Sequence, residues 1–203
     1  MTIKKYLRSN LGFIITLIAI MLMAFSPTVK GIVMQGLIKT GLFNPDVNDS
    51  DKTGESQQAD QSIAMPVAPS ATFTGEDGSA IDLTDLRGKV IFLNFWATWC
   101  PPCMAEMPSV NALHEKFKNN PSIVFMLVDA DGSLKKASAF MKKRNFSLPV
   151  YIPAAKIPEE LFQGSLPTTI IINKKGEIVF GHEGMADYNS PKVHQFLNKL
   201  ITE

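Results

Sequence analysis

Apolar positions are distributed unevenly along the 203-residue chain. From Leu11 to Phe25 nearly every side chain is apolar, and a polar, acidic stretch follows between Asn44 and about Ala64. From about Met65 onward, short apolar runs alternate with amphipathic stretches, which is typical of a folded domain. The pattern therefore divides the chain into three regions: 1–29, 30–64 and 65–203.

The last of these regions has the pattern of strands alternating with helices. Nearly continuous apolar runs, typical of strands buried on both faces, lie at 89–97 and 122–129, and further strands are predicted at 148–153 and 168–173. Amphipathic spacing and capping residues predict a helix after Cys100 and further helices at 133–144, 157–164 and 190–201. Turn signals predict a hairpin around 76–78 and an antiparallel return strand at 178–184. We therefore expect an α/β layer fold with a mixed sheet.

The apolar run near the amino terminus follows a basic head that contains no acidic residue. This order fits a cleaved signal peptide or an uncleaved signal anchor. The segment from Leu11 to Val29 is long enough to span a bilayer as a helix. The best cleavage frame would place Pro27 directly after the cut, where proline disfavours cleavage. We therefore expect a transmembrane anchor, with its basic end in the cytoplasm and the rest of the chain exported.

Residues 30–64 are expected to connect this anchor to the folded region. Residues 31–43 are apolar but interrupted, so they fit an extension of the span, an interfacial amphipathic segment or a short stalk. Residues 44–64 carry too few large apolar side chains to offset their ordering entropy, and they are predicted to form a flexible acidic linker. The expected location is single-pass in the inner (cytoplasmic) membrane, with 65–203 on the extracytoplasmic, periplasmic side.

Composition narrows the function of the folded region. The formal net charge is +1 and no basic cluster is present, which argues against a nucleic-acid partner. The chain contains 2 cysteines, Cys100 and Cys103, too few for the disulfide framework of a small secreted scaffold. The chemistry of this pair is therefore the main clue to function.

Several kinds of site could use a C-x-x-C pair. A structural zinc site needs four ligands, and His114, His182 and His194 do not stand at a paired, finger-like spacing. Covalent haem attachment needs a histidine directly after the second cysteine, where Met104 stands. A purely structural disulfide is possible, but so short a loop restricts the unfolded chain little. A dithiol–disulfide redox centre fits the pair best.

The expected local structure supports redox use. Cys100 lies at the predicted N-terminus of a helix, where unpaired N–H groups and the helix dipole stabilise a thiolate. Pro101 and Pro102 fill early helix positions, where a missing N–H costs little, and their stiff turn should hold the two sulfurs close. Cys103 follows one turn into the helix, where it can attack a mixed disulfide formed by Cys100.

The segment FWATWCPPC resembles the active-site segment of the thioredoxin superfamily. Together with the motifs IDLTDL, LRGKVIFLNFWATWCPPCMAEMPSVNAL and LPTTIIINKKGEIV, it resembles the membrane-anchored thiol–disulfide oxidoreductases of the TlpA and ResA type, over roughly residues 66–203. The resemblance implies a thioredoxin-like fold, a central mixed sheet flanked by helices, with an N-terminal β-hairpin and a βα insertion. It also implies a redox-active disulfide with no other cofactor, protein disulfide substrates, and a membrane protein as electron donor.

The same resemblance implies roles for particular residues. Cys100 would be the attacking thiol and Cys103 the resolving thiol. Pro167, in the motif SLPTT, matches the cis-proline that faces the disulfide in this fold, and the backbone beside Leu166 would pair with a bound substrate chain. Trp99, Pro101 and Pro102 would contact the substrate, with Trp99 shaping the rim around Cys100; the alternative for Trp96 and Trp99 is a packing role.

Two further positions bear on proton transfer. Glu106 matches the acidic residue of ResA-like sites, where a partly buried carboxylate could raise the pKa values of the thiols or relay a proton. The alternative is an ordinary solvated glutamate on a helix. Thioredoxins carry a buried aspartate on the preceding strand, where this chain has Asn94, which cannot titrate. Any carboxylate relay would therefore pass to Glu106 or to water.

We thus expect a thiol–disulfide oxidoreductase, and the resemblance favours a reductant in an oxidising compartment, with apocytochrome c thiols as one expected target. A disulfide-introducing oxidase stays open, because the reduction potential decides the direction. The lead-in LTDLRGKVIFLNFW also resembles peroxiredoxins, but their threonine, three residues before the reactive cysteine, is replaced by Ala97, with Thr98 one place off. A copper-binding module would have Met104 and Met107 beside the pair.

Overall fold

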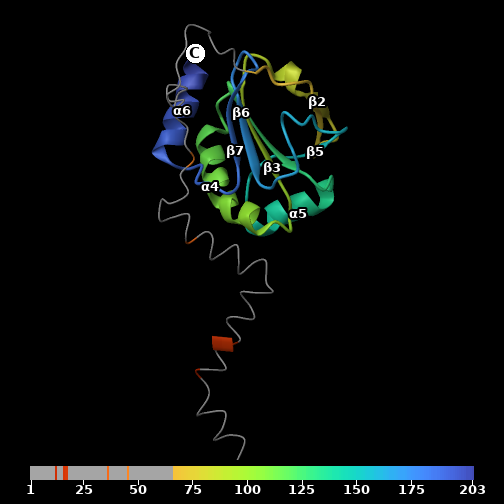
Figure 1. Ribbon diagram of the computed structural model, residues 1–203, viewed down its shortest axis with the longest axis vertical. Helices are drawn as coiled ribbons and strands as arrows, with labels where there is room; N and C mark the ends of the chain where they lie inside the picture. Colours follow the sequence, from red (N-terminus) through yellow and green to blue (C-terminus); the bar gives the residue numbers. More distant parts are fainter. Residues whose placement is uncertain (1–11, 13–15, 18–35, 37–44, 46–65) are drawn as a thin grey trace, which may run out of the picture.

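The computed structural model describes residues 12, 16, 17, 36, 45 and 66–203 (Figure 1). The expected anchor at 1–29 and the expected linker at 30–64 therefore lie outside the described residues, apart from a few isolated positions. Within the part of the chain that is described, no helix has both the length and the apolar character needed to cross a membrane.

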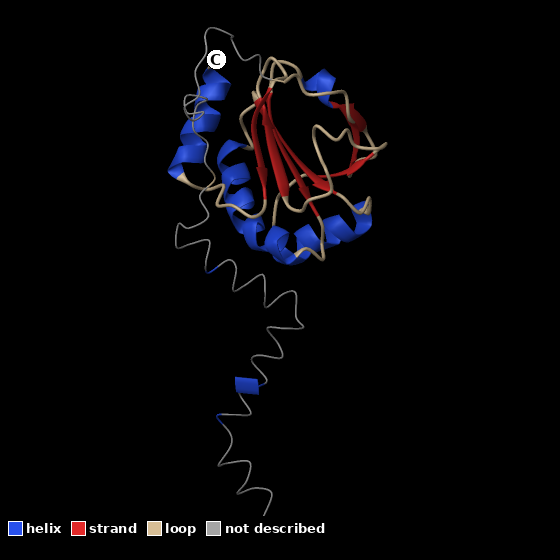
Figure 2. Ribbon diagram, viewed as in Figure 1, coloured by secondary structure: helices blue, strands red, loops and turns tan. Residues whose placement is uncertain are grey.

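A seven-stranded mixed sheet forms the centre of the folded region, in the order β2-β1-β5-β4-β3-β6-β7 (Figure 2). Its strands are β1 (Thr72–Gly75), β2 (Ala80–Asp82), β3 (Val90–Trp96), β4 (Ile123–Asp129), β5 (Val150–Pro153), β6 (Thr168–Ile172) and β7 (Ile178–Glu183). The strands β3, β4 and β5 pair in parallel, whereas the β1–β2 hairpin joins β5 antiparallel and β6 joins both β3 and β7 antiparallel. The predicted mixed sheet, the amino-terminal hairpin and the antiparallel return strand are confirmed.

Helices and irregular segments cover the two faces of the sheet. The helices are η1 (Leu83–Leu86), α4 (Pro101–Phe117), α5 (Leu134–Arg144) and α6 (Pro191–Thr202). Buried side chains of α4, α5 and α6 form one core cluster with β3 and β4, and η1 packs into a second cluster on the other face. Between β4 and β6 the chain forms α5 and then β5, and the expected βα insertion stays a prediction.

One predicted helix, at 157–164, is wrong. The segment instead makes a turn in which the N–H groups of Leu161 and Phe162 both donate to the carbonyl oxygen of Pro158, at 3.0 and 3.1 Å. Leu161 is buried, and the ring of Phe162 stacks on Phe95 at a centroid distance of 4.7 Å. A single turn is enough to bury these two side chains, and so short a segment gains little from continuing as a helix.

The carboxyl-terminal helix begins as the sequence predicts. Ser190 is the N-cap of α6, and its Oγ accepts a hydrogen bond from the N–H of Val193, at 3.4 Å. Pro191 occupies the first helical position, where no N–H is needed. The segment between β7 and this cap, residues 184–190, crosses over α4 and contributes to the site described next.

Candidate active site

The cysteine pair lies where β3 gives way to α4. Cys100 is the N-cap of α4, and its Sγ accepts a hydrogen bond from the N–H of Cys103, at 3.3 Å. The two cysteines form a disulfide, with a Cα–Cα distance of 5.3 Å. Pro101 and Pro102 occupy the first two helical positions, as predicted. The N-terminus of α4 therefore directs an N–H group at the sulfur that would carry negative charge after reduction.

Access to the disulfide is narrow. Cys100 is 3% exposed and Cys103 is fully buried, so the attacking sulfur is less exposed than a helix N-terminus alone would suggest. Trp99, directly before Cys100, is 59% exposed, and its Nε1 donates a hydrogen bond to Oδ2 of Asp131, at 2.7 Å. Trp96 is buried and packs on Phe140. Trp99 thus forms part of the rim, whereas Trp96 belongs to the core.

The loop before β6 lies at the same edge of the sheet. The peptide bond between Leu166 and Pro167 is cis, as the resemblance implied. In the pairing of β3 with β6, Phe95 lies opposite Thr168, so Pro167 lies beside the end of β3 from which the cysteine loop departs. Leu166 also packs against the core cluster that contains both cysteines. The fold therefore brings together two motifs that are distant in the sequence.

Glu106 is fully buried, which excludes the alternative of a solvated helix glutamate. It lies three residues after Cys103 and so shares one face of α4 with it. Its Oε1 accepts a hydrogen bond from Nδ2 of Asn94, at 2.8 Å, and its Oε2 accepts one from the N–H of Ala186, at 3.3 Å. Burial raises the pKa of Glu106 to about 8, and these two hydrogen bonds only partly offset that rise.

The sequence did not reveal the rest of this buried polar cluster. Nδ2 of Asn94 also donates to Oγ1 of Thr169, at 2.8 Å, across the β3–β6 pairing. Ser109, one turn beyond Glu106 on α4, accepts a hydrogen bond from the N–H of Tyr188, at 3.2 Å. No local pattern marks these contacts, because they join β3, α4, β6 and the 184–190 segment. The asparagine that replaces the thioredoxin aspartate therefore holds the carboxyl group of Glu106.

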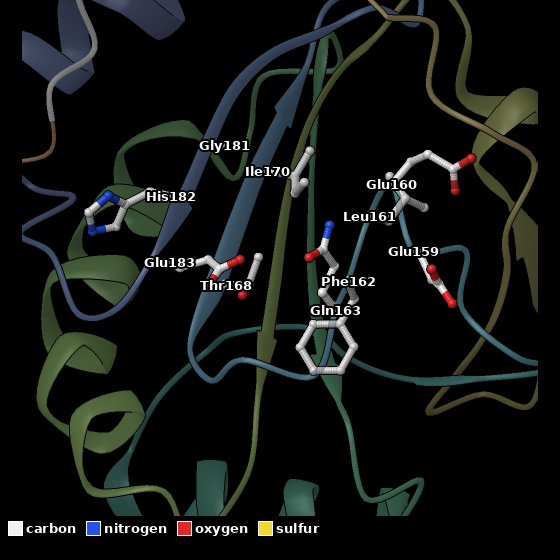
Figure 3. A pocket seen from close by; sticks show the side chains of 10 residues that line it. All are labelled: Glu159, Glu160, Leu161, Phe162, Gln163, Thr168, Ile170, Gly181, His182 and Glu183. Atoms are coloured by element: carbon white, nitrogen blue, oxygen red, sulfur yellow. The ribbon is translucent and has the colours of Figure 1, made fainter.

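A cavity of about 190 Å³ lies beside the start of β6. Figure 3 shows Glu159 and Glu160 on the side of the 157–164 segment and Glu183 on the side of β7. The complete lining is Glu159, Glu160, Leu161, Phe162, Gln163, Thr168, Ile170, Gly181, His182 and Glu183. None of the site residues predicted from the sequence lines this cavity, so the redox site and the cavity are separate features.

These observations define the class of protein. A mixed sheet carries a C-x-x-C disulfide at a helix N-terminus, a cis-proline lies at the same sheet edge, and a buried carboxyl group lies on the same helix face. This is a thioredoxin-like fold with a dithiol–disulfide redox site. Among the described residues, no group of three or more His, Cys, Asp or Glu side chains could hold a metal ion.

Comparisons with known proteins identify the family. A family model described as Redoxin matches residues 64–197. A thiol-disulfide oxidoreductase ResA of Bacillus cereus is 40% identical over 113 residues, 55% of this chain and 65% of that protein. A ResA of Bacillus thuringiensis is 39% identical over 134 residues, 66% of this chain and 76% of that protein.

Among solved structures, one described as a thiol:disulfide interchange protein DsbE from Chlorobium tepidum superposes with a TM-score of 0.58. It is 25% identical in sequence, and the match covers 68% of this chain and 96% of that chain. The chain therefore belongs to the Redoxin family and, within the thioredoxin superfamily, to the ResA-like thiol–disulfide oxidoreductases.

Proposed function

We propose that this domain reduces disulfide bonds in protein substrates by thiol–disulfide exchange. The observation that carries the proposal is the Cys100–Cys103 disulfide at the N-terminus of α4, with Pro167 at the same sheet edge. The names of the ResA relatives and of the DsbE structure support exchange as the reaction.

In the reduced protein, the thiolate of Cys100 attacks one sulfur of the substrate disulfide, and the other substrate sulfur leaves as a thiolate. The resulting mixed disulfide is then attacked by Cys103, which releases the second substrate sulfur and closes the Cys100–Cys103 bond. Two electrons thus pass from the cysteine pair to the substrate. The two protons of the pair end on the substrate thiols, directly or through solvent and a protein base.

Glu106 is the base in this scheme. Cys103 must lose its proton before it can attack, and it is buried away from water. Glu106 is buried on the same face of α4, and its pKa of about 8 lies close to the usual pKa of a thiol, about 8.5. A proton acceptor matched in this way can take the Cys103 proton during attack and return it later.

The substrate chain is expected to bind across the rim of the site. The backbone beside Leu166 and Pro167 would pair with it in the manner of an added strand. Trp99, Pro101 and Pro102 would contact its side chains, since Trp99 is the exposed large apolar residue beside the disulfide. Trp99 and the half-buried Pro101 and Pro102 come from the cysteine loop, whereas Leu166 and Pro167 come from the loop before β6.

The electron source and location complete the proposal. A membrane protein would reduce the Cys100–Cys103 bond after each cycle, and the apolar segment Leu11 to Val29 would tether the domain in the cytoplasmic membrane, on its extracytoplasmic side. Apocytochrome c, whose cysteines must be reduced before haem attachment, is the expected target. The copper and peroxidase alternatives gain no support from the relatives named above.

The test is to trap the exchange intermediate. The Cys103→Ser variant should accumulate mixed disulfides through Cys100, visible as reducible higher-mass species on non-reducing gels. The Cys100→Ser variant is the matched control and should trap little. If Cys103→Ser captures no protein, exchange with protein substrates is wrong. Equilibration in glutathione buffers then decides direction, because a potential near the oxidising end, about −120 mV, would indicate a disulfide-introducing oxidase instead.

A further inference from the structure

Tyr188 is a buried phenol that the mechanism above does not use. It lies in the segment between β7 and α6 and is fully buried. Its ring meets Phe92 edge-on, at a centroid distance of 5.3 Å, and its N–H donates to Oγ of Ser109. Its hydroxyl makes no hydrogen bond of ordinary geometry to any described residue. A buried hydroxyl without a hydrogen-bond partner destabilises the folded state, so it calls for an explanation.

The position of Tyr188 relates it to Glu106. Phe92 and Asn94 are two residues apart on β3 and therefore face the same side of the sheet. Tyr188 packs on Phe92, and Glu106 is bonded to Asn94, so the two side chains are neighbours over the same strand. The charge of Glu106 raises the pKa of Tyr188 beyond the effect of burial, while the nearby hydroxyl of Thr169 partly offsets it. The phenol hydroxyl is thus directed at the polar cluster around Glu106.

A second buried polar atom in the cluster also lacks a partner among the described residues. Oδ1 of Asn94 accepts no hydrogen bond from them, although Nδ2 of the same side chain donates twice. A phenol can donate one hydrogen bond, but the Tyr188 hydroxyl has no acceptor in hydrogen-bonding geometry among the described residues, so its side chain must shift to reach one. Within this cluster, Glu106 becomes a stronger acceptor when it ionises, since hydrogen bonds to charged groups are roughly twice as strong as neutral ones.

We propose that Tyr188 is a positioning residue for Glu106, whose hydroxyl moves into hydrogen-bonding reach of the carboxylate when Glu106 ionises and so stabilises the base that accepts the Cys103 proton. The proposal rests on the exchange mechanism proposed above. It assigns to the 184–190 segment a part in proton transfer, although no residue of that segment contacts the disulfide in the reaction scheme.

The other groups that face Glu106 are uncharged, and two of them already donate hydrogen bonds to its carboxyl group. From β3 and β6 it is faced by the uncharged side chains of Asn94 and Thr169, and from the 184–190 segment by the N–H of Ala186. His182 on β7 lies opposite Thr169 in the strand pairing, and the charge of Asp187 acts on His194 of α6. Burial and the two hydrogen bonds account for the shifted pKa of Glu106, with no contribution from a charged side chain.

The test compares Tyr188→Phe with Tyr151→Phe, the same chemical change at a half-buried tyrosine that packs in the opposite core cluster. Both variants keep the aromatic ring, so both should fold. Titration of the Glu106 carboxyl carbon by NMR should show its pKa raised by about one unit in Tyr188→Phe and unchanged in Tyr151→Phe. An unchanged or lowered value in Tyr188→Phe would overturn the proposal.

A kinetic readout separates this inference from the proposed function. The reduced protein is reacted with a chromogenic aromatic disulfide, and release of the second aromatic thiol reports closure by Cys103. In Tyr188→Phe the pH profile of closure should move up by about one unit, which is about tenfold slower closure below the midpoint. In a Glu106→Gln background, Tyr188→Phe should cause no further change, because Tyr188 acts through Glu106.

Each failure has a distinct meaning. No second release in the wild type would refute exchange itself. A Glu106→Gln profile identical to the wild-type profile would refute the base role of Glu106. If both of those controls behave as expected and Tyr188→Phe leaves the profile in place, only the positioning role of Tyr188 is wrong.

Discussion

At the scale of single residues, the proposed proton transfer depends on the burial of Glu106. Three residues after Cys103 on an α-helix, a glutamate can equally face solvent or the core, and the sequence alone left both open. The structure buries it and gives its two oxygens two donors, Asn94 and Ala186. Neither donor is charged, so desolvation dominates and the carboxyl group holds its proton near neutral pH.

Replacing Glu106 with glutamine should lower the pKa values of the two thiols in the reduced protein. Above about pH 8, where Glu106 ionises, its carboxylate disfavours a second negative charge on Cys103, and glutamine removes that repulsion. Alkylation of the reduced protein by iodoacetamide, followed across pH, should therefore reach its midpoint at lower pH in Glu106→Gln. Closure by Cys103 should at the same time become slower near neutral pH, because the base is gone. An alkylation profile that does not move would mean that the carboxyl group does not act on the thiols.

At the scale of secondary structure, α4 is tied to the segment that follows β7. The hydroxyl of Ser109 donates to the backbone carbonyl oxygen of Glu106, at 2.8 Å, and accepts from the N–H of Tyr188, at 3.2 Å. The bond from Ala186 to Glu106 lies one turn away on the same helix. These contacts hold the 184–190 segment over the buried carboxyl group and so keep water from it.

Ser109→Ala should destabilise the folded protein by about 1–2 kcal/mol, since it removes a hydrogen-bonded pair and leaves the N–H of Tyr188 unsatisfied. The variant should also lower the pKa of Glu106 toward its ordinary range, because a looser segment admits water. Urea unfolding and carboxyl titration measure the two effects. Ser138→Ala, at a half-buried position of α5, is the matched control, because it makes the same change within a helix far from Glu106. Equal effects of the two variants would argue against this link.

The elements themselves could be predicted largely from the sequence. The strands β3 and β4 were recognisable as continuous apolar runs because both of their faces are covered. The start of α6 was recognisable from its Ser-Pro cap, because capping depends only on residues that are neighbours in the sequence. The turn at 157–164 was not recognisable from the sequence, because it is stabilised by packing of Leu161 and Phe162 into a core formed by distant strands.

The site was predictable only in part for the same physical reason. Cys100, Cys103 and Pro167 lie in sequence motifs that the chain shares with the family it resembles. The contacts around Glu106 are not marked by any such motif. Ala186 is 80 positions further along the chain, and Thr169 contacts Asn94 only because β3 and β6 are paired in the sheet. Contacts of this kind depend on the register of β3 with β6 and on the path of the chain after β7. Neither can be read from local sequence.

At the scale of the whole molecule, the buried carboxyl group couples stability to pH. The pKa of Glu106 is about 8 in the folded protein against an ordinary value of 4.5. Between these values the folded state keeps a proton that the unfolded chain has lost. The free energy of unfolding should therefore fall as pH rises from about 4.5 to about 8, by on the order of 3–5 kcal/mol, and this contribution should level off outside that window.

Urea unfolding of the oxidised protein at pH 5 and pH 9 measures this change. Glu106→Gln should lose most of the pH dependence, because glutamine is neutral throughout. Glu76→Gln, in the exposed turn of the hairpin, makes the same substitution without burial and should retain it. If the wild-type protein is equally stable at both pH values, then Glu106 does not hold a proton in the folded state.

The long separation between Glu106 and Ala186 also has a consequence for how the protein is made. Cys100 and Cys103 are neighbours in the sequence, so a growing chain can join them soon after both have been synthesised. The segment that covers Glu106 is synthesised later than the cysteine pair, since Ala186 follows Glu106 by 80 positions. A chain that ends before Ala186 would therefore carry the cysteine pair beside a water-exposed glutamate of ordinary acidity. During synthesis the cysteine pair is therefore complete before the segment that buries Glu106 has been made.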